Sequence, residues 1–163
     1  MRLFVAIDLS EEMKKSLAGT MHELKKKGVG GNYVPMQNMH LTLAFLGEVE
    51  DVQAVKDALA GIKFKPFQLS LSELGNFDQI LWAGVKGNQG LSSIAKMVRD
   101  ALDQADIPYD HKKFAPHITL IRKATGKWQN VAVPKESMMV KKISLMSSTI
   151  RDGKPVYKEI FSV

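Results

Sequence analysis

The sequence of 163 residues contains no cysteine. It therefore excludes disulfides, thiolate metal sites and a thiol nucleophile. Long apolar runs are also missing, since none approaches the roughly 20 residues that span a membrane. The apolar start of the chain ends at Asp8, which is too early for an export signal. We therefore expect a cytoplasmic protein without a membrane partner.

Histidine is scarce, yet two of the four histidines belong to the same four-residue motif, His-x-Thr-Leu. The copies are His40-Leu41-Thr42-Leu43 and His117-Ile118-Thr119-Leu120. The length and an apolar content of 45% suit one globular domain over residues 1–163. The repetition of a motif that contains a residue this rare indicates a shared physical role for its two copies.

The first copy lies in an alternating segment, Met39–Leu46. Alternate side chains of an extended strand point to opposite faces. His40, Thr42 and Ala44 would therefore share one face, and the small Ala44 would leave room for a ligand. The opposite, apolar face would hold Leu41, Leu43 and Phe45.

The second copy follows Pro116, whose fixed φ favours an extended start. The same alternation would place His117 and Thr119 on one face and Ile118 and Leu120 on the other. Each copy therefore predicts a half-buried strand that projects an imidazole and a hydroxyl together.

Two imidazoles on different strands suit acid–base chemistry at a phosphate. Histidine titrates near neutral pH, so one ring can take a proton from an attacking oxygen while the other protonates a leaving oxygen. The two threonine hydroxyls would donate hydrogen bonds to the non-bridging phosphate oxygens. This chemistry needs neither a metal nor a cofactor. The sequence alone does not say which histidine is the acid.

Other interpretations use the same residues. Both copies would be ordinary core strands if threonine only favoured β structure and the histidines were buried polar groups with hydrogen-bond partners. The two histidines would also suit a zinc site, but no carboxylate stands beside them. The repetition in matching strand contexts favours catalysis.

Further blocks of the sequence resemble a known family. The chain is similar to the two-histidine phosphoesterases, and within them to the LigT-type RNA 2',3'-cyclic phosphodiesterases, also described as 2'-5' RNA ligases. The similar blocks follow the family's order over nearly the whole chain: Arg2–Leu9, Tyr33–Pro35, Asn38–Val49, Leu81–Val85 and Phe114–Arg122.

The resemblance implies roles for the motif residues. It implies that His40 is the proton donor to the leaving oxygen, that His117 is the proton acceptor for water, and that Thr42 and Thr119 bind the phosphate. It also implies an α+β fold of two pseudo-symmetric lobes, with antiparallel sheets lining a central cleft and helices outside.

Two further residues are candidates for substrate binding by the same resemblance. Arg122 stands where the family has a basic residue that contacts the phosphate or nucleotide. On a regular strand its side chain would point away from the cleft, and it would reach a ligand only if the strand ended or bulged there. Tyr33 stands where the family often has Trp or Arg, which suggests stacking on a base.

Local patterns predict the order of the elements, and this order suggests a duplication. A strand at 2–8 and a helix at 11–27, capped by Ser10, precede the first motif strand, after which Gly47 would mark a turn. A helix at about 52–62, strands at 67–74 and 80–85, and a helix at 91–105 precede the second. A strand at 138–150, a tight turn at Asp152-Gly153 and a strand at 156–163 end the chain.

The formal net charge of +6 favours a polyanionic partner. The Lys25–Lys27 run closes the first predicted helix, where cations complement the helix dipole. Lys112 and Lys113 precede the second motif closely enough to border a cleft.

The leading hypothesis is an enzyme that hydrolyses a terminal 2',3'-cyclic phosphate on RNA to a 2'-phosphate, with weak 2'-5' ligation as the reverse reaction. The resemblance supplies this regiochemistry. A non-catalytic module that binds RNA ends or a nucleotide, and a phosphodiesterase for small cyclic-phosphate nucleotides, are the alternatives. We expect a monomer, and the sequence implies no protein partner.

Overall fold

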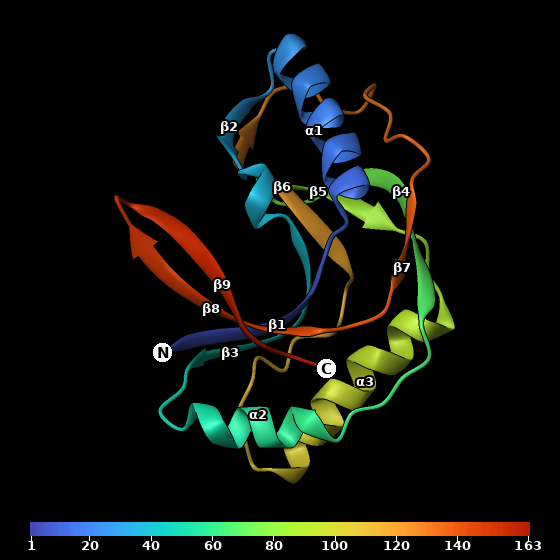
Figure 1. Cartoon of the computed structure of the whole chain (residues 1–163). Helices are drawn as coiled ribbons and strands as arrows, with labels where there is room; N and C mark the ends of the chain where they lie inside the picture. The colour runs from blue at the N-terminus through green and yellow to red at the C-terminus, as the bar shows by residue number, and fades with distance from the viewer.

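The computed structural model describes residues 1–163 and has an α+β architecture (Figure 1). Three α-helices, one 3-10 helix and nine strands follow one another as β1 (Arg2–Asp8), α1 (Glu11–Lys26), β2 (Gly30–Tyr33), η1 (Met36–Asn38), β3 (His40–Glu48), α2 (Val52–Ala60), β4 (Phe67–Phe77), β5 (Ile80–Val85), α3 (Gln89–Gln104), β6 (His117–Thr125), β7 (Ser137–Val140), β8 (Ser144–Arg151) and β9 (Lys154–Ser162).

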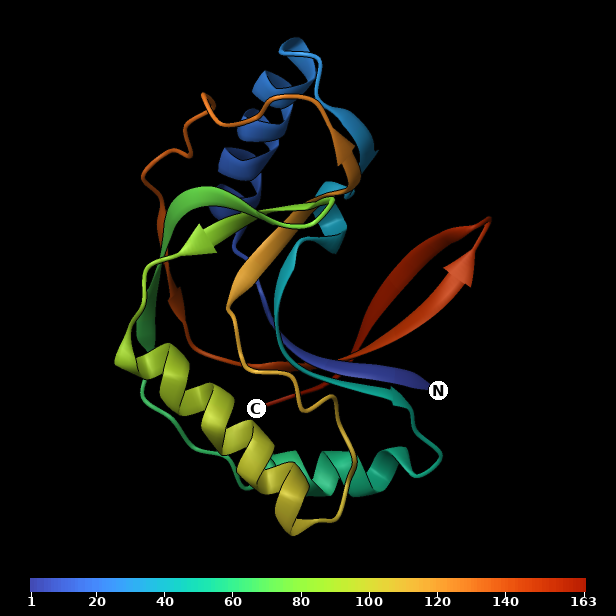
Figure 2. The ribbon, with the colours of Figure 1, turned by 180° about the vertical axis from the view of Figure 1, so that it is seen from behind.

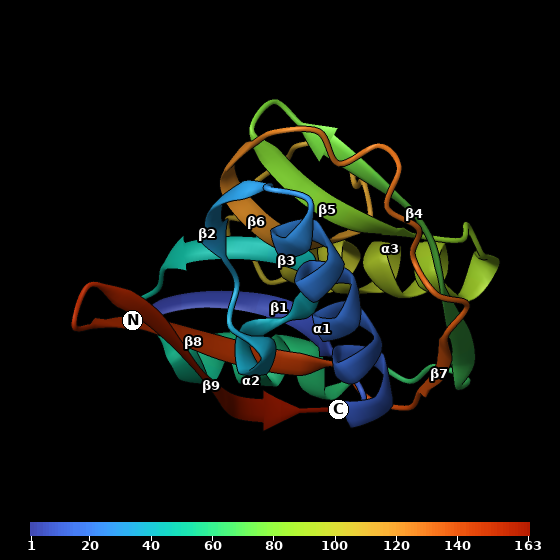
Figure 3. The ribbon, with the colours of Figure 1, turned by 90° about the horizontal axis from the view of Figure 1, so that it is seen from above.

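The nine strands form two antiparallel sheets. The four-stranded sheet has the order β3-β1-β8-β9, and the five-stranded sheet has the order β2-β6-β5-β4-β7. The motif strands β3 and β6 belong to different sheets but contact each other, and Figure 3 shows them side by side from above. The fold therefore brings the two His-x-Thr motifs together where the sheets meet.

Each helix begins at a side-chain cap, as Ser10, Asp51 and Asn88 each accept a hydrogen bond from a backbone N–H three residues later. Figures 1 and 2 place α1 beside the five-stranded sheet and α2 and α3 together below β1 and β3. The predicted apolar stripe of α3 is buried: Leu91, Ile94, Ala95, Val98 and Leu102. None of the helices is both long enough and apolar enough to cross a membrane.

One apolar core joins the two sheets. A single cluster of 32 buried residues includes Val5 of β1, Leu41 of β3, Leu69 of β4 and Ile118 of β6. Protein interiors are close-packed, so this shared core fixes β3 relative to β6. The geometry between the two motif strands is therefore part of the fold.

The predicted strand at 138–150 is wrong, because the segment forms two strands. β7 pairs with β4 in one sheet, whereas β8 pairs with β1 in the other. The chain crosses between the sheets at Lys141 and Lys142. Alternation alone could not reveal this crossing, because the break contains neither glycine nor proline.

A long hairpin of β8 and β9 extends away from the helices (Figure 1). Asp152 and Gly153 connect its strands with φ angles of 52° and 75°. Two positive φ angles match a type I′ turn, which confirms the predicted tight turn. The hairpin carries Tyr157 to the first motif, where its ring lies edge-on to His40 at 5.3 Å between centroids.

Two smaller features differ from the expectations. β2 has no alternating apolar pattern and was not predicted, yet it pairs with β6. Gly47, expected at a turn, lies inside β3 with a φ of 73°. Glycine adopts this backbone conformation without strain, which permits the irregular pairing of β3 with β1 at this point.

Candidate active site

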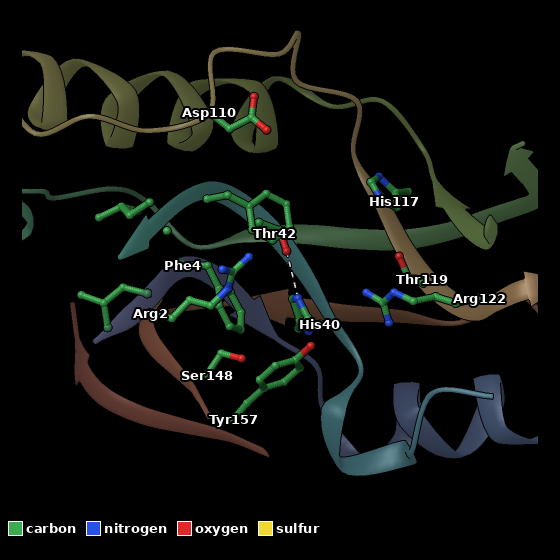
Figure 4. A pocket seen from close by; sticks show the side chains of 14 residues that line it. Arg2, Phe4, His40, Thr42, Asp110, His117, Thr119, Arg122, Ser148 and Tyr157 are labelled. Atoms are coloured by element: carbon green, nitrogen blue, oxygen red, sulfur yellow. Dashed lines mark hydrogen bonds between the residues drawn. The ribbon is translucent and has the colours of Figure 1, made fainter. Parts of the chain in front are cut away.

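A cleft of about 460 Å³ lies between β3 and β6, and Figure 4 shows the side chains that line it. The lining includes both histidines and both threonines of the repeated motifs, together with the arginine of the second motif strand: His40, Thr42, His117, Thr119 and Arg122. Segments 77 residues apart in the chain therefore present the same pair of functional groups to one space.

Both motif strands carry a β-bulge three residues after the histidine. The pairing of β3 with β1 shifts at Leu43, and the pairing of β6 with β5 shifts at Leu120. An extra residue in one strand reverses the alternation of the side chains beyond it. The residue five positions after each histidine, Phe45 in β3 and Arg122 in β6, therefore lines the cleft.

The first bulge overturns the predicted faces of the first motif strand. Ala44, expected beside the imidazole and hydroxyl, is 2% exposed and belongs to the core. Phe45, expected in the core, is 52% exposed and lines the cleft. An aromatic side chain, which offers a flat apolar surface to a nucleobase, therefore stands where a small residue was expected.

The second bulge decides the orientation of Arg122. On a regular strand, alternation predicted that this side chain points away from the cleft, and only a strand end or a bulge would turn it inward. Figure 4 shows Arg122 beside Thr119, with its guanidinium in the cleft. A guanidinium in this position can donate two hydrogen bonds to one phosphate group.

The two histidines are held in the same way. Nδ1 of His40 lies 2.7 Å from the carbonyl oxygen of Asn38, and Nδ1 of His117 lies 2.7 Å from that of Ala115. A carbonyl oxygen only accepts hydrogen bonds, so Nδ1 carries the hydrogen in both rings. The Nε2 atoms are left to exchange protons with a ligand.

Aromatic rings and a hydroxyl fix the orientation of His40. Its ring centroid lies 4.8 Å from that of Phe4, and Tyr157 covers a second side. Nε2 lies 2.9 Å from Oγ1 of Thr42, as the dashed line in Figure 4 marks. The neutral ring accepts a hydrogen bond from this hydroxyl, and the protonated ring donates one to it.

The backbone carbonyl that holds His40 is itself fixed by the β8–β9 hairpin. The side-chain amide of Asn38 donates a hydrogen bond of 3.1 Å to the carbonyl oxygen of Pro155. Asn38 is buried, at 8% exposure. The hairpin therefore supports the first histidine both through Tyr157 and through this amide.

His117 is oriented by the five-stranded sheet. Its ring lies edge-on to Phe77, with centroids 5.0 Å apart, and at 6.2 Å from the ring of Trp82. These aromatic contacts and the bond to Ala115 leave its Nε2 without a protein partner. The nitrogen is therefore free to bind water or a ligand.

The pKa of His40 is lowered below the ordinary value of a histidine. Burial of the ring is the main cause, and the positive charge of Arg122 acts in the same direction. The hydrogen bond to the Asn38 carbonyl and the negative charge of Asp8 oppose these effects. An anion in the cleft would raise the pKa of His40, because it stabilises the imidazolium.

The cleft carries more positive than negative charge, since Arg2 and Arg122 line it with one carboxylate, Asp110. This balance suits an anionic ligand. No group of three or more His, Asp or Glu side chains is arranged to hold a metal ion.

Tyr33 lies outside the cleft. It lines an adjoining hollow that shares Arg122 and Tyr157 with the cleft. Its hydroxyl donates a hydrogen bond of 2.6 Å to the carbonyl oxygen of Val29, and burial raises the pKa of this hydroxyl. The structure thus separates Tyr33 from the two histidines but leaves it next to Arg122.

Sequence reasoning missed several residues of the cleft besides Phe45: Arg2, Phe4, Asp110, Ser148 and Tyr157. Arg2 and Phe4 belong to a block that resembles the family, which was the only signal for any of them. Asp110 is placed by a backbone hydrogen bond of 2.8 Å from its N–H to the carbonyl of Phe45. No local pattern could have revealed that contact.

The basic pair before the second motif does not line the cleft. Neither Lys112 nor Lys113 is among the lining residues. Arg99 of α3 donates a hydrogen bond of 3.0 Å to the Lys112 carbonyl, and its guanidinium lies over the ring of Tyr109. These contacts instead anchor the loop that leads into β6.

Comparisons of the chain with known proteins agree on one family. The family model of the 2'-5' RNA ligase superfamily matches residues 13–149. A Thermotoga maritima protein named RNA 2',3'-cyclic phosphodiesterase is 30% identical, over 99% of this chain and 94% of that protein. An Escherichia coli protein of the same name is 32% identical, over 96% of this chain and 92% of its own length.

A solved structure is similar over the whole fold. The crystal structure of Escherichia coli LigT in its apo form has a TM-score of 0.85 and 29% sequence identity, and the match covers 99% of this chain and 95% of that one. The expected LigT-like α+β architecture is therefore confirmed.

Proposed function

Because this chain belongs to the 2'-5' RNA ligase superfamily, we propose that it is an RNA 2',3'-cyclic phosphodiesterase, which hydrolyses the cyclic phosphate at an RNA end to a 2'-phosphate. Relatives of that name, similar over nearly the whole chain, support the proposal. The observation that carries it is the convergence of two His-x-Thr pairs from different sheets on one cleft.

The proposed reaction is an in-line displacement at phosphorus. His117 takes a proton from the attacking water through Nε2, while His40 gives its Nε2 proton to the leaving 3' oxygen. The new P–O bond forms as the bond from phosphorus to the 3' oxygen breaks, and the bond to the 2' oxygen remains. One proton leaves the water and one reaches the 3' hydroxyl, so exchange with solvent restores both rings.

The remaining residues stabilise the charge at phosphorus. The hydroxyls of Thr42 and Thr119 donate hydrogen bonds to the non-bridging oxygens, and Arg122 supplies positive charge. The lowered pKa of His40 makes its protonated form a stronger acid toward the leaving oxygen. A bound cyclic phosphate supplies the negative charge that lets His40 gain this proton.

Several finer properties belong to the same proposal. We propose one bilobal domain over residues 1–163 that acts as a monomer in the cytoplasm, with RNA ends as its substrate and 2'-5' ligation as the weak reverse reaction. A small cyclic-phosphate nucleotide would meet the same catalytic groups. It would differ only in the contacts beyond the reacting phosphate.

The direct test is hydrolysis of an RNA oligonucleotide that ends in a 2',3'-cyclic phosphate, with EDTA present. We expect turnover to a 2'-phosphate, identified by chromatography against 2'- and 3'-phosphate standards. The variant with both His40 and His117 changed to alanine is the control for a contaminating activity.

Other outcomes of this assay would contradict particular parts of the proposal. Formation of a 3'-phosphate would contradict the assigned leaving oxygen, and activity only with an added divalent cation would contradict metal-independent chemistry. Tight binding of the cyclic end without turnover at any pH would favour a non-catalytic binding module, which has no need of two titrating groups.

A further inference from the structure

A second hollow of about 830 Å³ adjoins the catalytic cleft. It lies between β2 and the tip of the β8–β9 hairpin, and Figure 2 shows these two segments on the same side of the molecule. The hollow and the cleft share Arg122 and Tyr157 as lining residues. A ligand that passes these two side chains would therefore occupy both spaces.

The lining of this hollow is cationic. Lys25, Arg122 and Lys154 contribute positive charge, and no aspartate or glutamate lines it. The catalytic cleft, in contrast, has a carboxylate in its lining, Asp110. An anionic group that leaves the cleft is therefore attracted toward the hollow.

One of these cations is held in place by an aromatic ring. Nζ of Lys25 lies over the ring of Tyr33, 4.7 Å from its centroid. The hydrogen bond from the Tyr33 hydroxyl to Val29 fixes that ring. A lysine held over a fixed ring loses less conformational freedom when it binds an anion, which favours binding.

We propose that this hollow binds the nucleotide on the 5' side of the terminal cyclic phosphate, with Lys25 and Lys154 contacting its phosphodiester. The inference rests on the proposed function and adds to it a preference for a strand over a single nucleotide. The terminal nucleoside occupies the cleft, where Phe45 offers its ring to the base. The preceding phosphodiester then passes Arg122 into the hollow.

The opposite direction suits a phosphodiester less well. There the strand would meet Asp110, whose negative charge opposes that of a phosphate. Figure 4 shows Arg2, like Asp110, on the side of the cleft away from Arg122, so its positive charge compensates part of this negative charge. The hollow offers three cations without a carboxylate, so it is the favoured path for the strand.

The test compares kcat/KM for a 2',3'-cyclic mononucleotide with that for a dinucleotide that carries the same cyclic end. The wild-type protein should prefer the dinucleotide by about tenfold at low salt, because charge-assisted contacts to the extra phosphate stabilise its complex. The preference should shrink as the salt concentration rises.

The variant Lys154→Gln should reduce the ratio of the two kcat/KM values by about threefold, and Lys25→Gln combined with it should bring the ratio close to one. Lys86→Gln, an exposed lysine outside both spaces, is the matched control and should keep the wild-type ratio. Far-ultraviolet circular dichroism checks that every variant is folded.

The outcomes separate this inference from the function on which it rests. Equal kcat/KM for the two substrates in the wild-type protein, or an unchanged ratio in the Lys25 and Lys154 double variant, would overturn the second site while leaving hydrolysis intact. Absence of hydrolysis with both substrates would instead overturn the proposed function.

Discussion

Replacing His117 with alanine is expected to lower kcat/KM for hydrolysis of an RNA 2',3'-cyclic phosphate by about 100-fold to 10,000-fold, the usual contribution of a general acid or base. Its Nε2 faces the cleft without a protein partner, so the proposed base would be lost. His40→Ala should cause a loss of similar size, because the 3' oxygen would leave without its proton. Single-turnover kinetics, with the protein in excess over the RNA but below saturation, gives kcat/KM for each variant.

The two changes should not be additive. One ring removes a proton as the other supplies one, so the double variant should be little worse than the poorer single variant. His22→Ala, on α1 and outside the cleft, makes the same chemical change and should retain the wild-type rate. A single variant that kept the wild-type rate would remove that histidine from the reaction.

The second large effect is expected at the threonines. Thr119→Val keeps the shape of the side chain but removes the hydroxyl, and kcat should fall by about 100-fold to 1,000-fold, as when one donor to a developing anion is lost. Thr42→Val should cause a similar fall. Thr42→Ser and Thr119→Ser retain the hydroxyl and should restore most of the activity.

The two threonine variants should differ in one respect. Thr42 also contacts Nε2 of His40 at 2.9 Å, so its removal should change the pH dependence of kcat as well as its size. No corresponding contact joins Thr119 to His117, and Thr119→Val should lower kcat with little change in its pH profile. Valine variants as active as the serine variants would show that the hydroxyls do not bind the phosphate.

The elements of the fold were largely predictable because their signals are local. The cap at Ser10, the stripe on α3 and the turn at Asp152-Gly153 each depend on residues within a few positions of one another. The crossing from β7 to β8 was not predictable. The crossing depends on which distant strand each half of the segment pairs with. The alternation of apolar and polar residues is the same whichever sheet a strand joins.

The motif residues of the site were predictable because alternation holds as far as the bulges. His40, Thr42, His117 and Thr119 all precede the extra leucine in their strands, whereas Phe45 and Arg122 follow it. A bulge depends on pairing with a neighbouring strand, which the sequence of the bulged strand does not reveal. This is why Ala44 and Phe45 were placed on the wrong faces.

The rest of the cleft comes from long-range contacts. Tyr157 reaches His40 because the β8–β9 hairpin pairs with β1, and Asp110 reaches Phe45 through one backbone hydrogen bond. Neither residue belongs to a recognisable sequence motif. Only the packed structure could identify them as neighbours of the two motif histidines.

The most direct test of the central claim, that both imidazoles face one phosphate, is an NMR titration of their ring protons with inorganic phosphate. We expect the His40 and His117 resonances to shift together with a single dissociation constant and a stoichiometry of one anion per chain. In the free protein, the pKa of His40 should lie below its ordinary value and should rise when phosphate binds. A response from only one ring, or two separate dissociation constants, would contradict the account.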